Sequence, residues 1–435
     1  MVVNCLKKFV SLTSETTYIS ARYRQFGRQS KLEVNSNNMD KAKFLTILFL
    51  FLTANIVAQS ENEVYRFSID IANTIEKDTV AWKYQMGANA YAFIGNFQKT
   101  RETWERNFGG AVVQKMTEQD SLYFMEFTPI CAKNYIIERS KNEQIVIINE
   151  AHTFPNHRTF THSLLQGLYD NGFRYLGLEA LFDTLINERQ FPIMESGHYT
   201  KEPEFGNLIY TALKIGFTLF GYEAPNNLQG REREIVQAQN IVSFMEKHPN
   251  AKILIHCGHD HVIKGTPRNA SWEKAMAGRL KEFTQIDPFT IDQTQFAERS
   301  DKKYNHPLIA MLNKDFPVIL IDENGNLFNG ARNSNRVDCI IIHPITRYIN
   351  NRPNWLLMNG NRKKYHIEKS KITQYPLLVF AYRKNEFDKN GVPADIIEIY
   401  ENENVSPLIL GKGDYEIIIK DKNYNTINRH SIKIE

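Results

Sequence analysis

Carboxylate and imidazole side chains follow four short apolar runs of this sequence, at the point where each run ends. The first run, residues 145–148, is made of isoleucine and valine and is followed within four residues by Glu150 and His152. The other side chains of this kind are Glu179, Glu223, His256, His259 and His261. A neutral imidazole oriented by a carboxylate is a general base that can take a proton from water. The same groups also ligate divalent transition metals, whose bound water then becomes the nucleophile.

The apolar runs are predicted to be strands of one sheet, because helix-like sequence separates each run from the next. We expect strands at residues 145–150, 175–179, 218–223 and 252–256, and helices at residues 157–171, 206–216, 231–248 and 271–283. Strands that alternate with helices form an α/β fold, here a mostly parallel sheet with helices on both faces. Ligands of such sheets bind outside the carboxyl ends of the strands. The four strand ends are therefore expected to converge on one pocket.

Histidine placement supports a role for these strand ends in chemistry. Half of the twelve histidines lie in the windows 152–162 and 256–261. We expect His152 and His256, which end strands, to take part in chemistry, whereas spacing alone does not decide between His259 and His261. If a divalent metal binds, the candidate ligands are Glu150, His152 and His256. Spacing alone does not decide between the metal-free and metal-bound mechanisms.

Several function classes are disfavoured by what the sequence lacks. There is no Gly-x-Ser-x-Gly motif, which disfavours a serine nucleophile of the α/β-hydrolase kind. No glycine-rich phosphate loop follows the first strand. No basic stripe with interleaved aromatic residues is present, and the formal net charge of +4 comes from the first 58 residues. Nucleic acid is therefore not expected as a partner.

The regions on either side of the predicted sheet differ from it in pattern. Residues 61–143 are predicted to be a helical segment, including one helix that begins after Thr117 and continues through Tyr135. The α/β domain is expected at residues 144–362, and the irregular segment 187–205 is expected to cover its pocket. Residues 363–435 alternate between apolar and polar positions and predict a small antiparallel β module.

The first 58 residues predict export. Residues 39–58 have the charged start, short apolar core and small-residue exit of a signal peptide, with cleavage after Ala58 or Ser60. Residues 1–38 are interpreted as an upstream extension from a mis-set start codon, the alternative being a genuine N-terminal anchor with a long cytoplasmic tail. The mature protein is expected to be periplasmic or secreted, with no stable membrane span.

The strand-end residues resemble one known superfamily, which unites erythromycin esterase-like enzymes, ChaN-like haem-binding lipoproteins and Tiki/TraB-type proteases. Residues 149–157 resemble the Gly-Glu-x-His-x4-His opening of the ChaN-like branch, with Asn149 in place of the usual glycine. Leu178 and Glu179 resemble the acidic end of the second esterase strand. Residues 233–240 and 252–261 resemble the esterase Arg-Asp-x-x-Met-Ala-x-Asn helix and the histidine strand.

The resemblance implies which residues form the site. Its catalytic residues would be Glu150, His152, Glu179, His256 and His261. In that set His152 would activate water, Glu150 or Glu179 would orient it, and His256 or His261 would assist as an acid or metal ligand. Arg233 and Asn240 would hold the site or the substrate from their helix, and Glu223 and His157 complete the candidate substrate-binding set. The expected function is an exported hydrolase acting on an ester or amide in a small molecule or peptide. Two alternatives remain: a non-catalytic protein that binds haem or metal, and a degenerate interaction protein.

Overall fold

A six-stranded sheet lies at the centre of the computed structural model, which describes residues 63–332, 334–400 and 405–435. The predicted signal peptide and upstream extension lie outside the described residues. The strands run in the order β4-β3-β5-β2-β6-β8, and every neighbouring pair is parallel. Their bounds are Thr218–Gly221 (β4), Phe173–Leu178 (β3), Lys252–Gly258 (β5), Ile145–Glu150 (β2), Phe289–Asp292 (β6) and Cys339–Ile340 (β8). The predicted parallel α/β fold is therefore confirmed.

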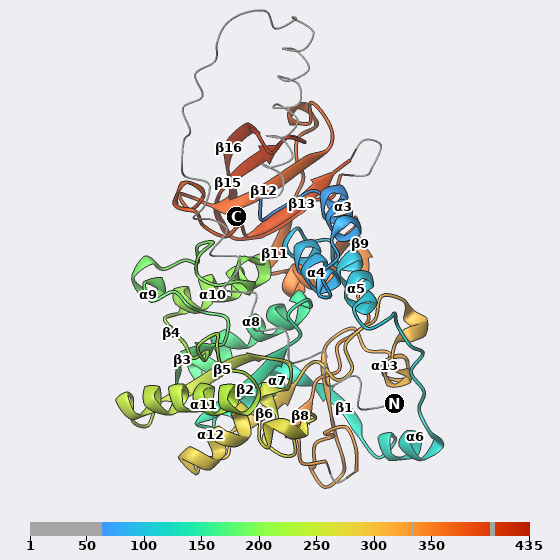
Figure 1. Cartoon of the computed structure of the whole chain (residues 1–435), viewed down its shortest axis with the longest axis vertical. Helices are drawn as coiled ribbons and strands as arrows, with labels where there is room; N and C mark the ends of the chain where they lie inside the picture. The colour runs from blue at the N-terminus through green and yellow to red at the C-terminus, as the bar shows by residue number, and fades with distance from the viewer. Residues whose placement is uncertain (1–62, 333, 401–404) are drawn as a thin grey trace, which may run out of the picture. The chain divides into compact units, whose positions relative to one another are not determined.

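Helices cover both faces of this sheet (Figure 1). The four crossover helices are α8 (Pro155–Asp170), α10 (Pro203–Ile215), α11 (Gly230–Lys247) and α12 (Met276–Thr284). Val146 and Ile148 face a core shared with α8 and α10, whereas Ile145 and Ile147 face a core shared with α11 and α12. Successive side chains of a strand point to opposite faces, so an unbroken β-branched run serves both cores.

The fourth crossover helix begins later than predicted. Ser271 lies in a short 3-10 turn, η4 (Ala270–Trp272), and α12 starts five residues further on, at Met276. The side chain of Asn269 accepts a hydrogen bond from the Ser271 backbone N–H. Glu273 then adopts a left-handed φ of 59°, which breaks the helical path between the two elements.

The region before the sheet is helical with one interruption. It contains α3 (Ser68–Lys77), α4 (Lys83–Phe93), α5 (Phe97–Arg106), α6 (Glu118–Phe124), β1 (Thr128–Cys131) and α7 (Ala132–Ser140). Thr117 does cap α6, in a reciprocal capping box with Asp120. The prediction that this helix continues through Tyr135 is wrong. Pro129 cannot supply a helical N–H, and β1 pairs instead with β7 (Val318–Ile321) in antiparallel register.

The C-terminal region forms the predicted antiparallel β structure. Its main sheet has the order β13-β12-β15-β16, with bounds Asp395–Ile399, Leu377–Arg383, Gly413–Lys420 and Thr426–Ile434. A separate pair joins β11 (Arg362–Tyr365) to β14 (Leu408–Gly411). One face of the main sheet packs on α3 and α4, where Ile71 and Tyr91 share a core with Phe380 and Ile418. The two ends of the described chain are thus joined through one hydrophobic core.

The fold also includes short elements that complete the connections. They are α9 (Ile186–Arg189), η2 (Tyr199–Lys201), η3 (His259–Val262), η5 (Lys302–Tyr304), α13 (Pro307–Leu312), β9 (Tyr348–Ile349), β10 (Arg352–Pro353), η6 (Asn354–Gly360), η7 (Lys369–Lys371) and η8 (Phe387–Lys389). In the described part of the chain, no helix has both the length and the apolar character needed to cross a membrane.

Candidate functional site

Glu150 is the centre of a buried cluster at the carboxyl end of β2. Its side chain accepts from the guanidinium of Arg158 through both oxygens, each at 2.6 Å. His152 Nδ1 lies 3.0 Å from Glu150 Oε1, and His256 Nε2 lies 2.9 Å from Oε2. Because β2 and β5 are neighbours, their ends place the two imidazoles on one carboxylate. The predicted meeting of these strand ends is confirmed.

Arg158 makes the ionised form of Glu150 stable. Burial by itself raises the pKa of Glu150, but the charge and hydrogen bonds of Arg158, with those of His152 and His256, hold that pKa well below its usual range. Arg158 lies in the first turns of α8, fully buried, and its remaining donors bond Glu202 Oε2 at 3.0 Å and the His152 carbonyl oxygen at 2.9 Å. A persistent carboxylate beside His152 stabilises that imidazole when it becomes protonated.

Among the side chains of His152, Glu150 and His256, that of His152 is the most accessible to solvent. Its side chain is 19% exposed, whereas the side chains of Glu150 and His256 are 2% and 1% exposed. The ring stacks on Tyr199, with centroids 4.0 Å apart and an angle of 11° between planes. If Nδ1 carries the proton that bonds Glu150, then Nε2 presents a lone pair, which is the arrangement of a general base.

Gly258 makes room for His152. A Cβ atom on Gly258 would lie 2.6 Å from His152 Nε2, which is far inside van der Waals contact. The backbone N–H of Gly258 also donates to Glu179 Oε2 at 2.5 Å. The end of β5 therefore connects the Glu150 cluster to a second group of charged residues.

Arg233, on α11, is the centre of this second group. It donates to Glu179 at 2.7 Å from Nη2 and to Glu223 at 3.0 Å from Nε. Glu179 and Glu223 follow β3 and β4, which lie next to each other in the sheet. Burial raises the pKa of Glu179, but His261 and Arg233 outweigh it and lower that pKa to about 2. Both carboxylates are thereby held in place beside a partly exposed guanidinium.

His261 joins this group from the 3-10 turn after β5. Its Nδ1 lies 2.9 Å from Glu234 and its Nε2 lies 3.0 Å from Nη1 of Arg233. Burial lowers the pKa of His261, but the carboxylates of Glu179 and Glu234 outweigh it and raise that pKa above its usual value. The ring also stacks on Trp272, with centroids 5.4 Å apart.

His259 lies beside His152 and has a different environment. Its ring meets that of His152 edge to face, with centroids 5.1 Å apart. Burial and the nearby His152 lower the pKa of His259 to about 4, so His259 is neutral at pH 7. It can accept or donate a hydrogen bond near His152 without adding charge.

Two predicted substrate-binding residues have other positions. His157 is fully buried, its Nδ1 accepts from the Ala151 backbone N–H at 3.1 Å, and its ring packs against Phe154 and His343. Asn240 donates to the carbonyl oxygens of Tyr222 and Glu223, so it anchors α11 to the segment after β4. Among the described residues, neither side chain hydrogen-bonds a side chain of the Glu150 or Arg233 groups.

Three residues of the site were not predicted from the sequence: Arg158, Tyr199 and Glu202. Tyr199 and Glu202 belong to the irregular segment 187–205, which contacts His152 and Arg158 through them. The available signal was their place in a long connection beside a strand end. Arg158 had a weaker signal, a basic residue one turn into the helix that follows Glu150.

The Glu150 group does not have the character of a metal centre. Both carboxylate oxygens accept from Arg158, so a guanidinium occupies the position that a cation would need. His152 and His256 direct their ring nitrogens at the same two oxygens. Among the residues that the structure describes, no group of three or more His, Cys, Asp and Glu side chains is arranged to hold a metal ion.

Comparison with known proteins gives distant structural likenesses. No family model matches the chain, and no curated protein matches it. A solved structure of the type III effector HopBA1 aligns with 41% of this chain and 94% of its own, at 11% identity and a TM-score of 0.28. A structure described as bacterial protein toxins aligns with 51% of this chain and 50% of its own, at 13% identity and a TM-score of 0.28. Neither likeness is close enough to bear on the function.

Proposed function

We propose that this chain is an exported hydrolase of ester or amide bonds in which His152 activates water. The observation that carries the proposal is the pair formed by His152 and Glu150. In this pair a partly exposed imidazole hydrogen-bonds a carboxylate that stays ionised. His152 Nε2 would take the proton of the attacking water, and Glu150 would stabilise the imidazolium that forms. The stacked Tyr199 ring would keep the imidazole in that orientation.

Arg233 is the group proposed to hold the substrate. Its side chain is 27% exposed, more than the side chains of its partners Glu179 and Glu223, which are 9% and 13% exposed. A guanidinium fixed by two carboxylates is preorganised to donate to a carbonyl or carboxylate oxygen of the substrate without further movement. The substrate would be a small molecule or a peptide, and we propose that the protein meets it outside the cytoplasm after removal of residues 1–58.

The burial of the cluster favours a second candidate function. Glu150, His256 and His261 are all at most 5% exposed, and a buried polar network can serve fold specificity alone. In that case the chain would be an interaction protein without catalysis. The two candidates differ in what the loss of His152 changes.

The test compares wild-type protein with His152→Asn on a panel of p-nitrophenyl esters and peptide amides. A general base should lose on the order of 10²–10⁴ in kcat/KM, while the free energy of unfolding in urea should change by less than about 1 kcal/mol. His430→Asn on β16 is the matched control and should leave turnover unchanged. Full activity in His152→Asn, or activity that falls only in step with stability, would overturn the proposal and support the structural candidate.

A further inference from the structure

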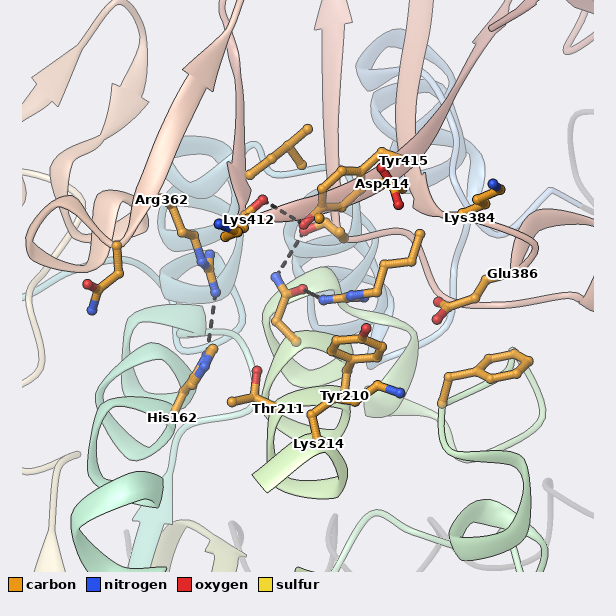
Figure 2. A pocket seen from close by; sticks show the side chains of 18 of the residues that line it. His162, Tyr210, Thr211, Lys214, Arg362, Lys384, Glu386, Lys412, Asp414 and Tyr415 are labelled. Atoms are coloured by element: carbon orange, nitrogen blue, oxygen red, sulfur yellow. Dashed lines mark hydrogen bonds between the residues drawn. The ribbon is translucent and has the colours of Figure 1, made fainter. Parts of the chain in front are cut away.

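A second cavity lies between α10 and the C-terminal β structure, away from the strand-end residues. Its volume is 590 Å³, and its walls come from α8, α10, the connection after β12 and the turn between β14 and β15. Figure 2 shows the side chains entering from two sides, with His162, Tyr210 and Lys214 on the helices facing Arg362, Lys412 and Lys384 on the β structure. None of the residues assigned above to the hydrolase site lines this cavity.

Positive charge dominates the cavity lining. Two of its arginines are neutralised elsewhere: Arg362 bonds both oxygens of Glu204, at 2.6 and 2.9 Å, and Arg189 pairs with Asp183. Four cations remain, and none of them forms an ion pair with another described residue: Lys214, Arg383, Lys384 and Lys412. They face the two lining carboxylates Glu386 and Asp414. The lining therefore carries an excess of about two positive charges when Glu386 is ionised and about three when it is protonated, which a dianion would largely balance.

The guanidinium of Arg383 is fixed by two contacts, and one of its donors has no partner among the described residues. Its guanidinium lies over the Tyr210 ring, 3.8 Å from the centroid, and Nη2 donates to Asn207 Oδ1. Nη1 is buried and has no hydrogen-bond partner among the described residues. A buried donor without a partner lowers stability, and an oxygen of a ligand would remove that penalty. The stacking and the Asn207 contact restrict the rotation of the guanidinium before any ligand arrives.

Glu386 adds a second polar group to the same wall. The residue is 6% exposed, and its Oε2 is buried without a partner among the described residues. Burial raises the pKa of this carboxyl, which favours the protonated form that can donate a hydrogen bond. A ligand hydroxyl is a suitable partner, since it bonds either form of the carboxyl.

We propose that this cavity binds a small phosphate monoester that carries hydroxyl groups, with its phosphate at Arg383 and the three lysines and a hydroxyl at Glu386. Phosphate has the charge and the acceptor oxygens that these donors require. The site is independent of the proposed hydrolase reaction, because it uses different residues at the opposite side of α10 and α8 from the sheet.

The experiment is isothermal titration of the protein with glycerol 3-phosphate, using glycerol as the neutral probe and inorganic phosphate as the headgroup alone. Glycerol 3-phosphate should bind saturably with a Kd at or below about 1 mM, which corresponds to roughly −4 kcal/mol, and glycerol should give no saturable heat. Inorganic phosphate should bind more weakly than the ester. Absence of saturable binding by both phosphate compounds would overturn the proposal.

Variants locate the binding. Lys412→Gln and Lys214→Gln lie at exposed positions and should each weaken glycerol 3-phosphate binding roughly three- to tenfold, and Arg383→Gln should weaken it further. Lys433→Gln, an exposed lysine of β16 outside the cavity, and His152→Asn should both retain wild-type affinity. If Lys433→Gln weakens binding as much as Lys412→Gln, the ligand is attracted by general surface charge and the proposed site is wrong.

Discussion

Arg158 and Glu150 form a bidentate ion pair that is buried in the protein, with both guanidinium–carboxylate hydrogen bonds at 2.6 Å. Such a pair is tolerated in a core because each charge satisfies the other. Arg158→Met would leave the Glu150 charge buried beside two imidazoles without its main partner. We expect a loss of about 3–5 kcal/mol in the free energy of unfolding, measured by urea denaturation.

Arg231→Met is the matched control for that variant. Arg231 also pairs with a glutamate, Glu273, at 2.8 Å, but both side chains are largely exposed. Exposed ion pairs contribute little to stability because water and salt screen them, so this variant should unfold close to wild type. Equal losses in the two variants would show that enclosure of the Glu150 pair has no special energetic role.

Gly258→Ala tests the position of His152. The added methyl group would occupy space within 2.6 Å of His152 Nε2, and His152 is partly exposed, so the ring can move outward. We expect kcat/KM on the substrate found in the screen to fall by roughly 10²-fold, as misplacement of a catalytic group does. The cost in stability should be smaller, about 1–3 kcal/mol.

Gly411→Ala provides the comparison, since the nearest atom to its added methyl group would be the Tyr415 hydroxyl at 3.8 Å. That variant should keep both activity and stability. An active Gly258→Ala protein would mean that the imidazole position seen here is not needed for turnover.

The sheet and its strand ends were predictable because they depend on local sequence. Runs such as residues 145–148 are apolar at every position, which suits strands buried on both faces, and the polar residues that end them had to meet once the strands were neighbours. Glu150 and His256 illustrate this, since parallel pairing of β2 and β5 alone brings them together.

The partners of those residues were not predictable, because they depend on packing between distant segments. Arg158 has the local sequence of a solvated helix residue, and its burial follows only from the placement of Glu202 and Phe205, more than forty positions later. The core shared by Ile71 and Phe380 likewise cannot be predicted from the sequence of either segment alone. Pro129, by contrast, was a local signal of the break before β1 that the helical pattern of its neighbours obscured.

Phe380→Ala tests the connection between the two ends of the chain. Phe380, on β12, is 1% exposed and packs in the core that includes α3 and α4. Removing its ring should lower the free energy of unfolding by about 3–5 kcal/mol and accelerate amide hydrogen exchange in residues 68–77. Ile427→Ala, at an exposed position of β16, should change stability by less than about 0.5 kcal/mol. Unchanged exchange in α3 would show that the helices fold independently of this sheet.

Glu202 gives the protein a distinctive dependence of stability on pH. Burial raises the pKa of this carboxyl to about 7 from an ordinary value of 4.5, with Glu204 adding to the effect and Arg158 opposing it. Between pH 4.5 and pH 7 the folded protein therefore keeps a proton on Glu202 that the unfolded chain has lost. By linkage, this group makes stability fall as pH rises through that window. Above about pH 7 its contribution levels off.

Glu202→Gln should remove this dependence, because glutamine has no proton to lose. When unfolding free energies are measured from pH 4.5 to pH 8, the variant should gain on wild type as pH rises and then stay at a constant difference. Glu150 and Glu179 do not add to the pH dependence between pH 4.5 and pH 8, since their pKa values are lowered and they titrate below this window. Glu232→Gln, an exposed substitution on α11, should parallel wild type throughout. Parallel curves for Glu202→Gln and wild type would show that Glu202 titrates like an exposed glutamate, and that its contact with Arg158 holds its charge at neutral pH.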